Sequence, residues 1–234
     1  MLKFLLIVFS ILFVLFPRST VFSQNVEFHE LGNRLRTCGE TWCRSVANAP
    51  SLWPQPCTTN TISIEVQPTI VVDIPAGFLQ IRKTGYFLMF IYKNKKVLTM
   101  EELSKEAFPE LSARTKNARL TMADAVHATF TRTPKDTPPA CPDDAQFWYW
   151  AMFFKMTFFE NSFPVFSSQK GPLTVYYLSS KRPGMALVND AVIINDNNPE
   201  HILKLKSTNM TLKEFKSIIG TTREKRNRNY ADHQ

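Results

Sequence analysis

The chain has 234 residues, only 7 of them glycine, and a formal net charge of +8. So few glycines leave little of the backbone freedom that phosphate-binding loops and tight catalytic turns use. The length is enough for one large domain or two small ones.

Residues 1–23 have the features of a cleaved secretory signal peptide. Lys3 precedes an unbroken apolar run from Phe4 to Phe16, which is shorter than the roughly 20 residues that a membrane-spanning helix needs. Val21 and Ser23 stand at the positions that a signal peptidase reads before Gln24. An uncleaved signal anchor is the alternative. We therefore expect a secreted, extracellular protein with no transmembrane segment after the signal.

The charge of the mature chain predicts the kind of partner. Without Lys3 and Arg18 of the signal, 26 basic residues face 20 acidic ones. A basic secreted protein more naturally meets an acidic glycan, an anionic surface or another protein than nucleic acid. Part of this charge lies in a predicted disordered tail, residues 221–234, where a furin-type protease could also cleave after REKR. The candidate binding residues in this tail are Arg223, Lys225, Arg226 and Arg228.

The four cysteines of the chain predict disulfides, because an even count in a secreted protein is typical of crosslinking. They are Cys38, Cys43, Cys57 and Cys141. The first three lie in an irregular, proline-interrupted segment, residues 24–60. Three pairings are open, and each full pairing would join this segment to the connector near Cys141. We expect two disulfides.

Residues 61–220 are predicted to form an α+β domain. The segment 61–67 alternates apolar and polar residues, as a half-buried strand does. Further strands are predicted at 69–74, 77–81, 86–92, 173–180, 186–196 and 201–206. Capping-box patterns predict helices that begin after Thr99, Thr121 and Thr211, the last one ending with Gly220. The proline-rich connector 131–144 is a candidate sub-boundary.

The segment 146–159, QFWYWAMFFKMTFF, is strongly aromatic and carries a single interior charge, Lys155. Its aromatic residues favour a buried strand, whereas Pro142 and the two aspartates after it favour the start of a helix. The helix is slightly favoured. Burial in the core is the main interpretation, and an exposed patch for a partner or lipid is the alternative. In the second case Trp148 and Trp150 are the candidate binding residues.

Catalytic and metal-binding motifs are scarce. The sequence HELGN, residues 29–33, resembles half of a zinc-protease motif, but Asn33 stands where the second histidine is required, so no metal is expected. His127 follows Asp124 in a helical pattern that could orient an imidazole as a base, and this pair is the weak catalytic candidate. A glycosylation sequon begins at Asn209.

The predicted fold is therefore α+β, with a mainly antiparallel sheet, about three short helices and an irregular, disulfide-stapled N-terminal segment. The predicted function is partner binding by a secreted, disulfide-bonded glycoprotein that needs no cofactor and has no evident catalytic motif. Two alternatives stay open. One is a secreted hydrolase whose site is assembled from distant residues, and the other is a carrier of an apolar ligand or lipid.

Overall fold

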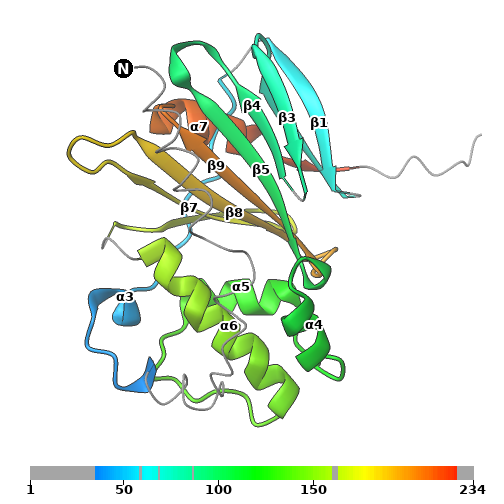
Figure 1. The fold of residues 1–234 in the computed structure, drawn as a ribbon, viewed down its shortest axis with the longest axis vertical. Coiled ribbons are helices and arrows are strands. Elements are labelled where there is room, and N and C mark those ends of the chain that lie inside the picture. Colours follow the sequence, from blue (N-terminus) through cyan, green and yellow to red (C-terminus); the bar gives the residue numbers. More distant parts are fainter. Residues whose placement is uncertain (1–34, 58–59, 68, 86, 160–162, 226–234) are drawn as a thin grey trace, which may run out of the picture.

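The computed structural model describes residues 35–57, 60–67, 69–85, 87–159 and 163–225 (Figure 1). The predicted signal peptide, the HELGN segment, Arg226 and Arg228 lie outside these residues. The described chain forms an α+β fold with two antiparallel sheets, as the sequence predicted. None of its helices is long and apolar enough to cross a membrane.

The larger sheet has seven strands, and its order differs from the order along the chain. The strands are, from one edge to the other, β3 (Gln80–Thr84), β4 (Phe87–Ile91), β5 (Val97–Ser104), β9 (His201–Thr208), β8 (Val188–Asn195), β7 (Leu173–Ser180) and β6 (Phe166–Lys170). The smaller sheet has the order β1 (Thr61–Gln67), β2 (Ile70–Pro75) and β10 (Arg223–Glu224). Every strand pair in both sheets is antiparallel.

The central strands of the larger sheet are buried on both faces. In β8, Val192 and Ile194 belong to one apolar cluster, whereas Ala191 and Ile193 belong to a second. The first cluster contains the residues of the helical layer, and the second contains those of β2 and of helix α7 (Leu212–Thr221). Two covered faces explain why this strand is a continuous apolar run.

The helical layer covers one face of the larger sheet. Its main helices are α5 (Met122–Thr131) and α6 (Pro142–Phe159), and the connector between them joins two helices that pack against each other. Shorter helical segments are α3 (Thr41–Arg44), α4 (Pro109–Arg114) and η2 (Lys105–Ala107). A further one, η1 (Lys93–Lys95), lies in the turn between β4 and β5. Three helices, α5, α6 and α7 (Leu212–Thr221), have seven or more residues, which agrees with the predicted number, although α6 with 18 residues is longer than expected.

The aromatic segment is helical and forms core. Phe147, Trp150, Phe158 and Phe159 are all at most 4% exposed. Helix α6 carries apolar residues all round because it packs against α3, α4 and α5 at once. Its first turn carries Asp143 and Asp144 at the positive end of the helix dipole, as the sequence predicted.

The predicted helix after Thr99 is wrong. Residues 97–104 instead form β5, which pairs with β4 on one side and with β9 along its whole length. Leu98 and Met100 point into the second apolar cluster. Pairing with a strand on each side gives hydrogen-bond partners to more of the backbone N–H and C=O groups of β5 than a short capped helix would. After this strand and η2, Pro109 is the first residue of α4.

The prediction of two disulfides is also wrong. Cys38 and Cys43 form a disulfide around α3, so the N-terminal segment is stapled within itself. Cys57 and Cys141 are free thiols. Cys57 is fixed on α7, where its backbone N–H donates to Ser217 Oγ (2.7 Å), while Cys141 directly precedes α6 in the layer on the opposite face of the large sheet. The sheet separates the two thiols.

Candidate functional site

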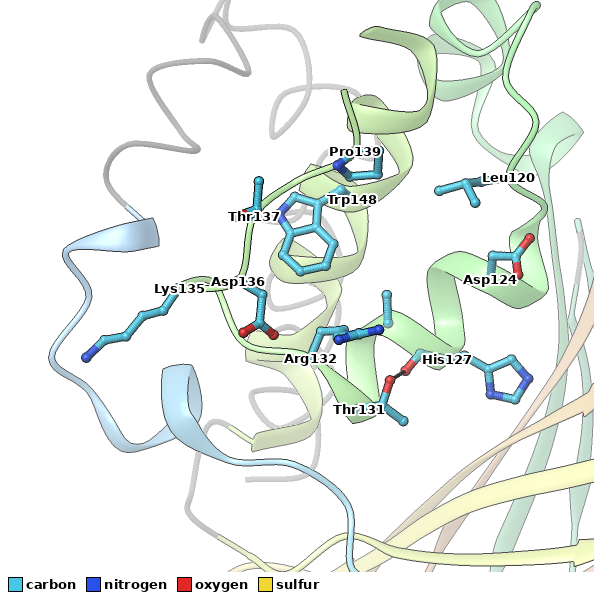
Figure 2. A pocket seen from close by; sticks show the side chains of 11 residues that line it. Leu120, Asp124, His127, Thr131, Arg132, Lys135, Asp136, Thr137, Pro139 and Trp148 are labelled. Atoms are coloured by element: carbon cyan, nitrogen blue, oxygen red, sulfur yellow. Dashed lines mark hydrogen bonds between the residues drawn. The ribbon is translucent and has the colours of Figure 1, made fainter. Parts of the chain in front are cut away.

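A groove of about 830 Å³ lies between α5, the connector 132–139 and α6 (Figure 2). We call it the α5–α6 groove. Three of the predicted candidate residues, Asp124, His127 and Trp148, line it. The full lining comprises Leu120, Asp124, His127, Ala128, Thr131, Arg132, Lys135, Asp136, Thr137, Pro139 and Trp148. The structure therefore brings together residues that the sequence placed in separate hypotheses.

Both carboxylates of the groove are engaged by the backbone. Asp124 Oδ2 accepts hydrogen bonds from the N–H (2.8 Å) and the hydroxyl (2.7 Å) of Thr121, which completes the capping box of α5. Asp136 Oδ2 accepts from the N–H of Thr133 (2.8 Å). These bonds use one oxygen, Oδ2, of each carboxylate and tie it to its own turn.

The hydrogen-bond donors of the groove are available. Arg132 and Lys135 are exposed, and neither side chain has an ion pair or hydrogen bond within the described part of the chain. The Trp148 side chain is only 8% exposed, yet its Nε1–H has no acceptor among the described residues. This nitrogen is not among the fully enclosed polar atoms without a partner, so it can donate to a molecule in the groove. The groove thus offers three unused donor groups beside two carboxylates that each accept backbone hydrogen bonds through Oδ2.

His127 lies at the side of the groove that faces the sheet (Figure 2). Its Nδ1 is 3.0 Å from the hydroxyl of Tyr176 on β7, and its Nε2 is 3.5 Å from Oδ1 of Asp196, just after β8. Asp124, the partner predicted from the sequence, caps the helix instead. Both imidazole nitrogens therefore face groups of the protein, which connects α5 to the sheet.

The environment of Tyr176 limits its chemistry. Burial, helped by the nearby negative charge of Asp196, raises the pKa of the phenol to about 12. The hydroxyl stays protonated at neutral pH, so it can donate to Nδ1 of His127 while Nε2–H faces Asp196. In this arrangement Nδ1 is bonded to Tyr176, and Nε2 faces Asp196 at an ion-pair distance rather than a substrate-sized opening.

The other predicted site residues lie elsewhere. Trp150 is buried and stacks on Phe154 with ring centroids 4.9 Å apart, so it is a core residue and not a surface anchor. Residues 221–225 of the predicted tail are described by the structure and include the end of α7 and strand β10. Arg223 belongs to β10 and pairs with Asp73 (2.7 Å). Lys225 likewise pairs with a carboxylate of β1, at 2.6 Å.

The sequon is half-buried at the turn before α7. Asn209 Nδ2 donates to the carbonyl of Lys95 (3.0 Å), and the backbone of Asn209 has φ +60°. The Thr211 hydroxyl is part of the capping box with Glu214, as the sequence predicted for this helix.

Sequence reasoning missed four residues of the site region. Arg132 and Lys135 stand in the connector, where exposed charges carry no periodic signal. Tyr176 and Asp196 are far from His127 in the chain, and only the pairing of β7 with β8 brings them near it. Among the described residues, no group of three or more histidine, cysteine, aspartate or glutamate side chains could hold a metal ion.

Comparisons with known proteins add little. No protein-family model matches the chain, and no curated protein matches it. A crystal structure from Bacteroides thetaiotaomicron has 8% sequence identity and a TM-score of 0.28, and the match covers 68% of this chain and 46% of that one. The present chain thus spans less than half the length of that neighbour. A likeness this distant says nothing about the function of this chain.

Proposed function

We propose that the protein is a secreted binding protein that holds an acidic glycan in the α5–α6 groove. The observation that supports this most directly is the mismatch between donors and acceptors in the groove. Arg132, Lys135 and the indole N–H of Trp148 are unused, while both carboxylates already accept backbone hydrogen bonds. A ligand rich in anionic acceptors is the complement of such a lining.

A glycan fits the form of the groove better than a small apolar ligand. The volume of about 830 Å³ is within the range of ligand sites, but the lining includes charged groups from α5 and from the connector. Sulfate or carboxylate groups of an acidic saccharide can reach the guanidinium of Arg132 and the ammonium of Lys135. A ring oxygen or hydroxyl can then accept from Trp148.

The test is binding of a size-defined heparin oligosaccharide, measured by calorimetry at physiological salt. Replacing Arg132 and Lys135 together with alanine should weaken binding about tenfold or more, because two charge-assisted contacts are lost. The matched control replaces Arg82 and Lys83, two exposed cations of β3 on another part of the molecule. This control removes the same charge and should change affinity far less.

An equal loss in the two double variants would contradict the proposal, since the net field of the protein would then explain the binding. A chain that ends at Lys225 should retain the affinity of the full chain, because the groove is intact without the last residues. Preference for an acidic peptide over the oligosaccharide, with the same dependence on Arg132 and Lys135, would reassign the ligand class.

A hydrolase is the second candidate, and the observation that favours it is the placement of His127 between Tyr176 and Asp196. It is weaker because Nδ1 is bonded to Tyr176, Nε2 faces a carboxylate, and no serine or cysteine side chain contacts this histidine in the described residues. Prolonged incubation should therefore leave the oligosaccharide uncut. Cleavage that disappears in His127→Asn, with binding retained, would establish the enzyme instead.

The aromatic segment 146–159 is not available to line a carrier cavity, because it is packed in the core. Among the described residues, a different apolar pocket lies on the other side of the large sheet.

A further inference from the structure

A half-open pocket of about 440 Å³ lies beside α7, on the face of the large sheet away from the α5–α6 groove. We call it the α7 pocket. Its apolar lining comes from Pro75, Tyr92, Met210 and Ile218, and the last three of these side chains are at most 9% exposed. These residues come from the end of β2, the end of β4, the turn before α7 and α7 itself.

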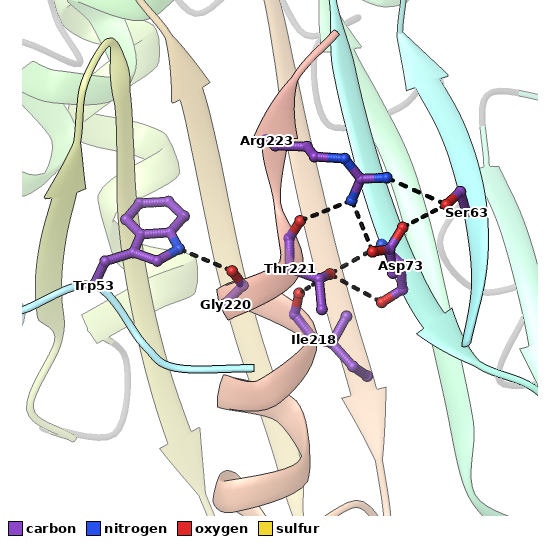
Figure 3. A network of polar contacts seen from close by, with 7 residues as sticks. All are labelled: Trp53, Ser63, Asp73, Ile218, Gly220, Thr221 and Arg223. Carbon is purple, nitrogen blue, oxygen red and sulfur yellow. Dashed lines mark hydrogen bonds and ion pairs between the residues drawn. The ribbon is translucent and has the colours of Figure 1, made fainter. Parts of the chain in front are cut away.

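The walls of the α7 pocket are held in place before any ligand arrives. Tyr92 Oη donates to the carbonyl of Pro75 (3.1 Å), which joins two walls. Trp53 Nε1 donates to the carbonyl of Gly220 (3.3 Å), and the N–H of Cys57 donates to Ser217 Oγ (2.7 Å), so the segment 53–57 is fixed along α7. Figure 3 shows the contact between Trp53 and Gly220. A preformed apolar pocket is typical of a ligand site.

The C-terminal end of α7 is fixed to the smaller sheet as well (Figure 3). The hydroxyl of Thr221 accepts from the N–H of Asp73 (2.9 Å), and Arg223 pairs with the carboxylate of the same aspartate (2.7 Å). Arg223 also donates to Ser63 Oγ (3.2 Å) on β1. The helix that forms one wall of the pocket therefore cannot shift without breaking contacts to two strands.

The rim of the α7 pocket is cationic. Lys96 pairs with Glu214 (2.6 Å), and the second oxygen of this carboxylate accepts from the N–H of Thr211 (2.8 Å) in the helix cap. Glu214 thus has both oxygens occupied. Lys213 is exposed and makes no ion pair or hydrogen bond in the portion of the chain that the structure describes. An apolar floor with one unpaired ammonium at its edge suits a ligand with an apolar chain and one negative end.

We infer that the α7 pocket binds a free acidic amphiphile of the fatty-acid type, with its alkyl chain on Tyr92, Met210 and Ile218 and its carboxylate at Lys213. This binding site is separate from the α5–α6 groove and does not depend on the proposed function. The apolar chain supplies the free energy of binding by leaving water, and the charge at the rim fixes the direction of insertion.

Cys57 provides a built-in reporter, because its thiol is free, exposed and part of the pocket lining. The full chain is treated with iodoacetamide, with and without decanoate below its micelle concentration, and each cysteine peptide is followed by mass spectrometry. Saturating decanoate should slow alkylation of Cys57 at least fivefold. Cys141, the other free thiol, lies on the opposite side of the sheet and should react at an unchanged rate.

The role of the charge is tested by Lys213→Glu, with Lys216→Glu as the matched control on the same helix outside the pocket lining. The first variant should raise the decanoate concentration needed for half protection by about tenfold. The second should leave it unchanged.

Three results would overturn the inference. The first is no protection of Cys57, the second is equal slowing of Cys57 and Cys141, and the third is equal protection by decanol in place of decanoate. Loss of heparin binding in the α5–α6 groove variants has no bearing on this result, so failure of one proposal can be told from failure of the other.

Discussion

At the scale of single residues, Lys155 places an ammonium group inside the helical layer. Its side chain is fully buried, and Nζ donates to the carbonyls of Ser45 and of Thr129 (3.0 Å). It also lies 4.3 Å from the centre of the Phe159 ring. These contacts join the N-terminal segment, α5 and α6 at one point. Burial lowers the pKa of this lysine to about 8, although the charge of Asp136 acts in the opposite direction.

The lowered pKa predicts a pH dependence of stability. Below about pH 8 the lysine is protonated in the folded and the unfolded chain, so the cost of burying its charge is fully present. Between about 8 and the ordinary lysine pKa of 10.5, the unfolded chain binds more protons. The free energy of unfolding therefore rises with pH, by up to about 3 kcal/mol from this group. Urea unfolding at pH 7.5 and at pH 10 measures this rise in the free energy of unfolding.

Lys155→Met is the comparison for this experiment, because it keeps the length of the side chain and removes the titrating group. We expect the difference in unfolding free energy between the wild type and the variant to move in favour of the wild type as the pH rises. Parallel pH profiles for the two proteins would contradict a depressed pKa at this position.

Residue identity alone predicted part of the candidate site. His127 and Trp148 were recognisable because a helical histidine and an aromatic anchor have local signals. The partners of His127 were not recognisable, because Tyr176 and Asp196 meet it only through strand pairing. Asp124 shows the opposite failure: its sequence neighbourhood fits both a helix cap and a catalytic pair, and the cap is what forms.

At the scale of elements, three similar capping patterns had different outcomes. Thr121 and Thr211 begin α5 and α7 with complete capping boxes, as predicted. Thr99 has the same local pattern but lies in a strand, because Leu98 and Met100 alternate into the core and two neighbouring strands pair with it. Short-range signals fixed helix starts only where no long-range pairing competed.

Gly220 lies in the last turn of α7, where the sequence suggested a left-handed helix terminus. The structure gives it another role, because a Cβ atom here would lie 2.5 Å from the carbonyl oxygen of Pro54 and 2.8 Å from the nitrogen of Pro56. Helix α7 and the segment 53–57 approach so closely that only a hydrogen side chain fits.

Gly220→Ala should therefore destabilise the protein by about 1–3 kcal/mol, since backbone must move to relieve the overlap. The control is Gly39→Ala, where a Cβ would meet no atom within 4 Å. Thermal unfolding of both variants tests this prediction. A Gly220→Ala variant as stable as the control would show that the segment 53–57 does not pack against α7 as described.

At the scale of the whole molecule, the fold class followed from the sequence but the arrangement of sheets did not. The strands predicted at 61–67 and 173–180 coincide with β1 and β7, but the sequence left open which strands are neighbours. The order of the larger sheet places β9 between β5 and β8, and the last two residues of the smaller sheet come from the expected tail. The charged residues 223–225 look like a solvated tail in the sequence, because their partners on β1 and β2 are far away in the chain.

These C-terminal residues should be required for stability. A chain ending at Lys225 should unfold at the same urea concentration as the full chain. A chain ending at Gly220 loses the contacts of Thr221 and Arg223 with Asp73 and also loses the buried Thr222, and we expect a loss of about 3 kcal/mol. Equal midpoints for the two shortened chains would exclude β10 as a stabilising strand.

The sequon at the turn before α7 has a consequence for how the protein matures. In the folded chain the amide of Asn209 and the hydroxyl of Thr211 are both engaged, one by Lys95 and the other by Glu214. If the chain is secreted as proposed, a glycosyltransferase that needs both groups would have to act on the nascent chain, before this turn closes. The fraction of chains glycosylated at Asn209 would then depend on how fast the enzyme acts relative to how fast this turn folds.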